Sequence, residues 1–386
     1  MGFYIGRGRK ARRSFGFDEV AIVPGRVTIN PEEVDTTWRL RDLEFSVPIL
    51  AAAMDGVVDT TMAVAMSKLG GLAVLNLEGV QTRYEDPSEV LSEIAEAPPE
   101  TATQLVQKLY APPMKDELVG KRIEEIKRDG GVAAVSCTPL QASRFGPLAE
   151  EAGAEVFVVQ STVATIDHIS SAYETLDFEG FIDSMEIPVI VGNCVTYEVA
   201  LDLMEAGADA VLVGVGPGAA CTTRGVLGIG VPQVTATVDC AAARDLFHKR
   251  TGRFVPVITD GGMDTGGDVC KAFASGADAV MIGSALARAE EAPGRGYHWG
   301  MATPHVNLPR GARVKTGTSG TLEEIILGPA RTDDGTQNLM GAVQTCMGTV
   351  GAKNIFELQQ AELIIAPAIR SEGKLMQRSQ HVGMWR

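Results

Sequence analysis

The sequence predicts an α/β protein built as a (β/α)8 TIM barrel, and two observations support this prediction. The first is a set of eight short apolar runs, separated by stretches that are compatible with helices. The runs are continuously apolar rather than alternating, which is typical of parallel strands covered on both faces. They occupy residues 48–54, 71–76, 131–136, 156–161, 188–193, 210–214, 256–262 and 279–283.

The second observation is a weak internal repeat. The segments EAGAEVFVV, EAGADAVLV and ASGADAVMI begin at Glu151, Glu205 and Ala274. Each contains a glycine suited to end a helix, then an acidic residue, then a strand, as at the joint of a (β/α) unit. We expect helices between the strands, for example over 196–207 and 265–276. The alternative is an open doubly wound sheet, but no GxGxxG follows the first strand.

The predicted barrel spans residues 18–370, between a basic tail over 1–17 and a C-terminal tail over 371–386. Two regions interrupt its alternation of strands and helices. Residues 77–130 are charged and helix-compatible, and they form an insertion after the second strand. Residues 290–322 are rich in Gly, Pro and Arg, and they follow the eighth strand. A long loop there emerges at the C-terminal face of a barrel, where active sites lie, so we expect an active-site flap.

Composition narrows the function further. Of the 386 residues 45% are hydrophobic and 22% charged, which fits a globular protein with a substantial core. A net charge of −15 disfavours general nucleic-acid binding. The six cysteines include no CxxC pair, which disfavours a zinc ribbon or a thioredoxin motif. No run of eighteen apolar residues could span a membrane, and the basic N-terminus has no apolar h-region of a secretory signal, so we expect a cytoplasmic protein.

The segment 214–233, GVGPGAACTTRGVLGIGVPQ, follows the sixth strand. Its first glycines, Gly214, Gly216 and Gly218, permit tight turns that expose backbone amides and carbonyls. Cys221 is therefore expected at the mouth of the barrel. A thiol there, among amide dipoles and near Arg224, is suited to act as a nucleophile. The alternative is a small residue in a tight turn.

The ends of the seventh and eighth strands predict a phosphate site. TDGGM ends one strand and GSALA the other, and the loops after these two strands are the usual phosphate site of such barrels. The amides of Gly261, Gly262 and Gly283, with the hydroxyl of Ser284, could cradle a phosphate. Asp260 is placed to accept from a ribose diol. The alternative is ordinary turn chemistry, since DGG and GS are common turns.

Together these motifs resemble those of IMP dehydrogenases and GMP reductases. The similar segments are the cysteine loop, FDEVAIVPGRVTINPEEVDTTWRL, VPILAAAMDGVVDTTMAVAMSKLGGLAVLN, VIVGNCVT, ITDGGM, MIGSALARAEEAPG and NLMGAVQTCMGTVGAKNIFELQQAELI. The resemblance covers nearly the whole chain. It is strongest to the short IMP dehydrogenase-related branch, because the CBS pair found in most IMP dehydrogenases is missing and residues 77–130 stand in its place.

The resemblance implies a reaction and a set of residues that carry it. Cys221 would attack C2 of a purine 5′-monophosphate, with Thr223 near the reacting centre; hydride would pass to NAD, and water would release XMP. Carbonyls of Gly216, Gly218 and Cys221 would hold a monovalent cation, typically potassium. The implied substrate contacts are Met54, Asp260, Gly261, Gly262, Gly283, Ser284, His298, Gly300, Met301 and Ala302. The implied cofactor contacts are Gln160, Asn193, Gly214 and Gly216. Homotetramers are usual in the family.

Several positions depart from the family pattern. Ala219 replaces a serine that gives the phosphate a hydroxyl, and His298 stands where the family has a tyrosine near the phosphate. Gln160 replaces an aspartate that helps to hold the dinucleotide. Leu212 replaces a basic residue before the cysteine loop. We interpret the changes at 160 and 212 as the coupled loss of one charge pair.

The flap departs most. IMP dehydrogenases carry an Arg-Tyr pair there that activates water, and no such dipeptide occurs in 290–322. Arg310 occupies the place of a glutamate or glutamine that both branches of the family have before a glycine. Arg310 and Arg313 are therefore candidates to help activate water. The alternative is that they bind phosphate or hold the flap down.

Four functions are compatible with these residues. The first is an IMP dehydrogenase that uses NAD. The second is a GMP reductase that uses NADPH; the missing CBS pair favours it, and Arg310 in place of the flap glutamate disfavours it. The third is a purine-nucleotide-binding protein with little catalysis, which the altered flap suggests and the retained cysteine disfavours. The fourth is a flavin-dependent barrel oxidoreductase, disfavoured because no obvious basic set for a flavin is present.

Overall fold

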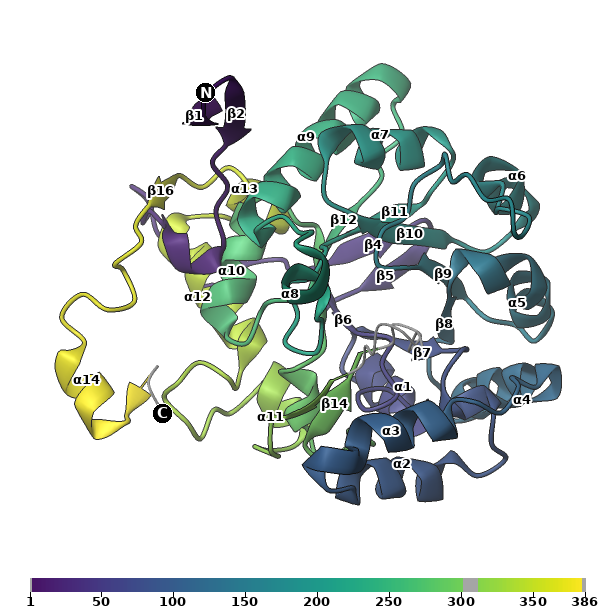
Figure 1. Ribbon diagram of the computed structural model, residues 1–386. Helices are drawn as coiled ribbons and strands as arrows, with labels where there is room; N and C mark the ends of the chain where they lie inside the picture. Colours follow the sequence, from purple (N-terminus) through teal and green to yellow (C-terminus); the bar gives the residue numbers. More distant parts are fainter. Residues whose placement is uncertain (1, 301–311, 384–386) are drawn as a thin grey trace.

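A computed structural model describes residues 2–300 and 312–383, and in this part of the chain eight parallel strands close into a barrel (Figure 1). This confirms the predicted fold class. The strands follow one another around the barrel in chain order, and the last pairs with the first. They are β6 (Ile49–Ala51), β7 (Leu72–Asn76), β8 (Ala134–Cys137), β9 (Val156–Gln160), β10 (Val189–Cys194), β11 (Ala210–Val213), β12 (Val257–Asp260) and β13 (Ala279–Ile282).

Helices surround the barrel and cover the outer face of its strands (Figure 1). The helices expected over 196–207 and 265–276 are present as α7 (Tyr197–Glu205) and α10 (Gly266–Ala274). Apolar side chains from helices and strands form one continuous core between the two layers. The helices of the ring are α1 (Thr60–Lys68), α4 (Asp116–Arg128), α5 (Pro139–Glu151), α6 (Phe178–Ser184), α7 (Tyr197–Glu205), α9 (Gln233–Thr251), α10 (Gly266–Ala274) and α12 (Leu339–Val350).

The acidic residue of the internal repeat has a structural role. In each copy its carboxylate accepts a backbone amide at the start of the preceding strand. The three bonds, all of 2.8 Å, join Glu155 to Ala133, Asp209 to Val189 and Asp278 to Val257. The carboxylate thus ties the joint before one strand to the beginning of its neighbour. Hydrogen bonds from backbone amides to a carboxylate are charge-assisted and strong, so the acidic residue of each repeat stabilises the barrel wall.

A small hairpin fills one end of the barrel. Its strands are β4 (Trp38–Leu40) and β5 (Leu43–Phe45), directly before β6. Trp38 stacks on Phe45 with ring centroids 5.1 Å apart. With Leu40 these rings pack against the inward-facing side chains of the barrel strands. Because the chain enters β6 from this hairpin, it plugs the amino ends of the strands.

The region expected as an insertion is helical. Residues 77–130 contain η3 (Val80–Thr82), α2 (Pro87–Glu96), α3 (Pro99–Leu109) and also α4, which packs against α1 and α5 as a member of the ring. The region expected as a flap contains an antiparallel pair, β14 (Tyr297–Trp299) and β15 (Arg313–Lys315).

The chain ends also carry structure. Where a basic tail was expected, β1 (Gly2–Gly6) and β2 (Arg9–Arg12) form a hairpin that projects from the body (Figure 1). The other elements are η1 (Phe17–Glu19), β3 (Val20–Ile22), η2 (Pro31–Glu33), α8 (Thr223–Leu227), η4 (Leu286–Arg288), α11 (Leu322–Ile326), α13 (Ile355–Leu358), β16 (Leu363–Ile365) and α14 (Leu375–Gln380). Among the described residues, no helix is long and apolar enough to cross a membrane.

The repeat acids give a stability prediction. Asp278→Ala removes the acceptor of the Val257 amide and the more buried of the two carboxylates paired with Arg244, which is 2% exposed and lies 2.6 Å from Asp278. The other carboxylate, of Asp245, is exposed. Asp209→Ala removes the same kind of acceptor, but its partner Arg41 is far more exposed. Urea unfolding should show a loss of about 3–5 kcal/mol for Asp278→Ala, as for a broken buried pair. We expect Asp209→Ala to lose about 1–3 kcal/mol. Equal losses of unfolding free energy in the two variants would mean that the buried pairing of Arg244 with Asp278 does not add to stability.

Candidate active site

A cavity of about 630 Å³ opens at the carboxyl ends of the barrel strands. Each of the eight strands contributes to its wall through one of its last two residues or through the loop that follows. This volume is typical of a site for a small molecule or a cofactor. Active sites of this fold lie at the carboxyl ends of the barrel strands, so the position of the cavity, like its volume, indicates an active site.

Most of the residues expected to act together line this one cavity. They are Met54, Gln160, Asn193, Gly214, Gly216, Gly218, Cys221, Thr223, Asp260, Gly261, Gly262, Gly283, Ser284, His298 and Gly300. Met301, Ala302 and Arg310 lie outside the described residues. The fold therefore brings the predicted nucleophile, ribose carboxylate and phosphate loops to one space.

The cysteine loop presents its thiol to this cavity. Cys221 is exposed, and its Sγ lies 3.2 Å from the hydroxyl of Thr223, to which the thiol donates. Thr223 is buried at the first turn of α8, so its hydroxyl is held in place. The amide of Cys221 donates to the carbonyl of Gly218 at 3.0 Å, which closes a turn just before the thiol. The thiol is thus both accessible and oriented.

The first glycine of the loop is required by a close approach. Gly214 has a φ of +155°, and a Cβ there would lie 2.3 Å from the carbonyl oxygen of Asp260. No larger residue fits while the loop passes this close to the end of β12. Arg224 fastens the loop from the other side. Its guanidinium donates to the carbonyls of Val215 and Val231, at 3.2 and 2.7 Å.

Three polar side chains meet at the ends of β9, β10 and β12. Asn193 donates to a carboxylate oxygen of Asp260 at 2.7 Å, and Gln160 donates to the same oxygen at 3.2 Å. Burial raises the pKa of Asp260 to about 6, and the hydrogen bond from Asn193 lowers it in part. Asp260 is therefore ionised at neutral pH but protonates more readily than an ordinary aspartate.

The structure also shows what surrounds the two altered family positions. Gln160 and Leu212 lie in register on either side of Gly192. Leu212 is fully buried among the inward-facing barrel residues, whereas Gln160 turns its amide to Asp260. A carboxylate at 160 would repel Asp260 across this short distance. An amide there supplies a hydrogen bond instead.

The predicted phosphate loops are closed by a histidine. His298 of β14 is 1% exposed, and its Nε2 lies 3.1 Å from the hydroxyl of Ser284. Its Nδ1 has no partner among the described residues. Burial lowers the pKa of His298 to about 4; Asp264 opposes this shift and Arg288 adds to it. The imidazole is therefore neutral at physiological pH and can donate one N–H.

These features agree with the comparisons to known proteins. A family model described as the IMP dehydrogenase / GMP reductase domain matches residues 14–375. The chain belongs to the IMP dehydrogenase / GMP reductase family. The predicted resemblance is confirmed at the level of the family.

Several known proteins are similar to most of this chain. An uncharacterized oxidoreductase of Mycolicibacterium smegmatis is 37% identical, and the match covers 94% of this chain and 99% of that protein. An inosine-5′-monophosphate dehydrogenase of Cryptosporidium parvum is 30% identical over 89% of each chain. The structure is similar to the crystal structure of an IMP dehydrogenase/GMP reductase-like protein from Corynebacterium glutamicum. That match has a TM-score of 0.89 and 34% identity, and covers 95% of this chain and 98% of the other.

Arg313, a candidate to activate water in this family member, is engaged elsewhere. It is not among the residues that line the cavity. Its guanidinium donates to three backbone carbonyls at the end of α2, at 2.5–2.8 Å. It also lies over the ring of Tyr297, 4.4 Å from the centroid. This placement fits the alternative interpretation, that Arg313 holds the flap down.

One wall of the cavity was not named from the sequence. Glu78 follows β7, and Cys137 and Thr138 stand at the end of β8. Glu78 accepts the amide of Thr138, and burial, with a smaller contribution from Glu78, holds the pKa of Cys137 well above its usual range. These residues could have been found from the sequence. Each stands at or just after the end of an apolar run, as Asp260 does.

The raised pKa of Asp260 gives a pH-dependent prediction. Its folded pKa of about 6 lies above the usual aspartate value, so the native state holds an extra proton between about pH 4 and 6. Above pH 6 the buried charge lowers stability, and below about pH 4 this cost is absent. Asp260→Asn should therefore stabilise the protein at pH 7.5 by about 2 kcal/mol, because it removes the charge and keeps an acceptor for Asn193.

Urea unfolding of both proteins at pH 7.5 and pH 4.5 checks this expectation. The advantage of the variant should shrink toward zero at the lower pH. An advantage that does not depend on pH would mean that the ionisation of Asp260 is not its cause.

Proposed function

We propose that the protein is an IMP dehydrogenase that oxidises IMP to XMP with NAD. The observation that carries this proposal is the pairing of an exposed, oriented thiol with nucleotide-binding groups in one cavity. Cys221 lies in the loop after β11, and the carboxylate of Asp260 lies at the end of β12. Ser284, which is bonded to His298, lies in the loop after β13. A cysteine nucleophile has no use in a protein that only senses nucleotides. The dehydrogenase of Cryptosporidium parvum supports the choice within the family.

The residues divide the work. The amides of Gly262 and Gly283, with Ser284 and neutral His298, hold the 5′-phosphate, and ionised Asp260 accepts the ribose hydroxyls. The sulfur of Cys221 adds to C2 of the base, the C2–N3 double bond opens, and N3 takes the proton of the thiol, which Thr223 orients. NAD, when bound, would supply the acceptor for the hydride at C2, and N3 would give up its proton. Water then adds to C2 and displaces the sulfur, which takes a proton from that water, so XMP forms and the thiol is regenerated.

The residues present fit a nicotinamide cofactor beside this site. The amides of Gln160 and Asn193 face the cavity next to Asp260 and can both give and accept hydrogen bonds. A potassium ion would be held by carbonyls of Gly216, Gly218 and Cys221. Among the described residues no group of three His, Cys, Asp or Glu could hold a metal ion. The ligands proposed for potassium are neutral backbone oxygens of the cysteine loop. Potassium accepts such oxygens without a charged ligand.

Assembly and location complete the proposal. The β1–β2 hairpin exposes Phe3, Tyr4 and Ile5 at 58–70%, and an exposed apolar strand of this kind is suited to a subunit contact. We propose a homotetramer in the cytoplasm, acting on a purine 5′-monophosphate.

A GMP reductase is the second candidate. It reduces GMP with NADPH and releases ammonia, and it needs no residue that activates water. The absence of an Arg-Tyr dipeptide from 290–322 favours it. The two candidates share the nucleotide half of the cavity, so turnover has to separate them.

Nicotinamide absorbance, measured in potassium buffer, distinguishes an IMP dehydrogenase from a GMP reductase. With IMP and NAD we expect reduced nicotinamide and XMP to form, and with GMP and NADPH we expect no consumption of NADPH. Cys221→Ser should lower the rate by at least about 10³-fold, since it removes the nucleophile. Cys346→Ser is the matched control, because that thiol is only partly buried but does not line the cavity. NADPH loss in the second assay would make the protein a GMP reductase.

Alkylation of the thiol provides a second test of the nucleophile. Bound IMP should slow modification of Cys221, and modification and loss of activity should proceed together. Activity that survives complete modification of Cys221 would exclude the covalent route.

Cation replacement tests the carbonyl site. If the turn at Gly216 and Gly218 binds potassium, sodium or lithium should support rates at least about tenfold lower, because smaller ions fit carbonyl oxygens placed for potassium less well. The measurement is the initial rate at constant ionic strength. A rate that is the same in all three salts would remove the cation from the proposal.

A further inference from the structure

The insertion between β7 and β8 packs directly on strand β14. Trp299 of β14 is fully buried, and it lies in an apolar cluster with side chains of η3, α2 and α3. Figure 1 shows α2 and α3 beside β14 at the edge of the barrel. The members of the cluster are Val80, Val90, Leu91, Ile94, Val106, Leu109 and Trp299. The two regions that interrupt the barrel pattern therefore share one small core.

The hydroxyl of Tyr110 links this core to the barrel. Tyr110, at the end of α3, donates its hydroxyl to the carboxylate of Asp55 and accepts the indole N–H of Trp299 at 2.8 Å. Asp55 is completely buried in the loop after β6, one residue beyond Met54 of the cavity wall. It also accepts the amide of Val80 at 2.8 Å. The insertion, β14 and the first barrel loop thus meet at one buried carboxylate.

Arg313 makes a second attachment, on strand β15. The carbonyls that it binds, of Ile94, Ala95 and Ala97, end helix α2 or follow it directly. The last carbonyls of a helix have no partner within the helix and carry its negative dipole end, so a guanidinium satisfies them well. The two strands of the pair are therefore fastened separately, β14 through Tyr110 and β15 through Arg313.

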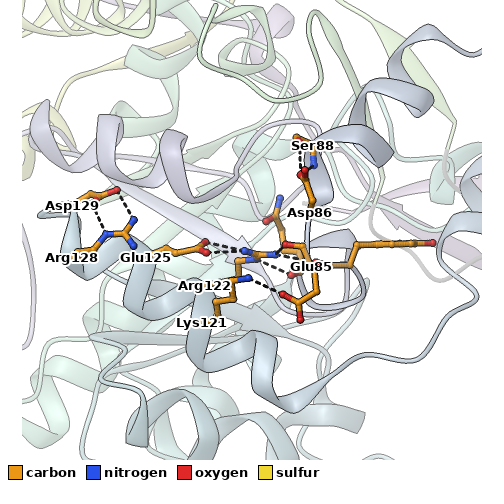
Figure 2. Close-up of polar contacts among 10 residues, drawn as sticks. Glu85, Asp86, Ser88, Lys121, Arg122, Glu125, Arg128 and Asp129 are labelled. Atoms are coloured by element: carbon orange, nitrogen blue, oxygen red, sulfur yellow. Dashed lines mark hydrogen bonds and ion pairs between the residues drawn. The ribbon is translucent and has the colours of Figure 1, made fainter.

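The insertion is itself anchored to the ring of helices. Arg122 of α4 is 4% exposed and donates to the carbonyls of Gln81, Tyr84 and Glu85 at 2.8–3.0 Å. Figure 2 shows its guanidinium between this turn and the carboxylate of Glu125. The turn so fixed is the one that aims the amide of Val80 at Asp55. A buried arginine with all these bonds satisfied makes η3 a rigid support.

The attached strand carries a residue of the cavity. Side chains alternate along a strand, so Trp299 points into the insertion while its neighbour His298 reaches Ser284. Gly56 lets β14 lie directly on the loop after β6, since a Cβ there would be 2.9 Å from the Cα of His298. Any shift of β14 is therefore a shift of His298.

We propose that the α2–α3 insertion is a positioning element for the phosphate side of the cavity. Tyr110 and Arg313 are its positioning residues: they hold β14 and β15 so that His298 stays against Ser284. Neither touches the ligand. The inference rests on the proposed function only for the identity of the phosphorylated ligand, because the attachment of β14 is a property of the protein alone.

The first test compares Tyr110→Phe with Tyr84→Phe in the full chain. Both tyrosines pack on the same cluster, but the Tyr84 hydroxyl bonds Leu109 within the insertion and does not reach β14. Backbone hydrogen exchange of a peptide that contains 297–299 should be about tenfold faster in Tyr110→Phe, because Trp299 and Asp55 lose a buried partner. It should stay unchanged in Tyr84→Phe, as should exchange of β10 in both. Equal exchange of 297–299 in the two variants would overturn the proposal.

A second pair of variants tests the proposal if a variant of the first pair does not fold. Arg313→Met should also speed exchange of 297–299, whereas Arg295→Met should not, because Arg295 reaches α2 only through an exposed ion pair with Glu96. The ligand readout is the concentration that half-protects Cys221 from alkylation. For IMP it should rise about tenfold in Tyr110→Phe and Arg313→Met, and for inosine, which has no phosphate, it should change less than about twofold.

The outcomes separate this proposal from the proposed function. Equal weakening for IMP and inosine would mean general loosening and would overturn a role at the phosphate side. If IMP fails to protect Cys221 even in the unaltered protein, the proposed function fails. Hydrogen exchange still decides in that case whether the insertion positions β14.

Discussion

The pairing of the last barrel strand with the first is the constraint on which the rest of the structure depends. In register, Val280, Met281 and Ile282 lie beside Ile49, Leu50 and Ala51. The amide of Ala52 donates to the carbonyl of Ile282 at 3.0 Å, so the ladder continues to the rim. Two loops more than two hundred residues apart in the chain thereby become neighbours. Gly283 shows how close they come, because a Cβ there would lie 3.1 Å from the sulfur of Met54.

Under the proposed function the cavity would bind an anion, although the protein as a whole is acidic. The net charge is −15, yet at physiological ionic strength charges beyond about 8 Å are largely screened. Groups close to the ligand therefore determine whether an anion binds. At the predicted phosphate loops these groups are backbone amides, a hydroxyl and a neutral imidazole. Burial raises the pKa of Asp260, which lies against the amides of Asn193 and Gln160 and, among the described residues, has no hydrogen bond to a second carboxylate. A dianion and a carboxylate can thus face the same nucleotide from different strand ends.

The barrel and most of the cavity could be predicted because both follow from local patterns. Parallel strands buried on two faces are continuous apolar runs, and their carboxyl ends meet at one rim, so Cys221, Asp260 and Ser284 could be placed together without a structure. The partners of Arg313, Tyr110 and Trp299 could not. Their contacts join segments about two hundred residues apart, and no periodicity fixes how a helical insertion docks on a loop. Arginine adds to the difficulty, because its long side chain can serve a ligand or a helix end equally well.

The departures from the family pattern do not share one side of the rim. Leu212 lies in β11, Ala219 in the loop that follows it, and His298 on β14, whereas Gln160 ends β9. Two of these side chains are bonded to residues that keep the family pattern. The Nε2 of His298 lies 3.1 Å from the hydroxyl of Ser284, and Gln160 donates to Asp260 at 3.2 Å. The altered residues therefore support the retained ones, and under the proposed function recognition of the mononucleotide would rest on mutually bonded groups from several strand ends.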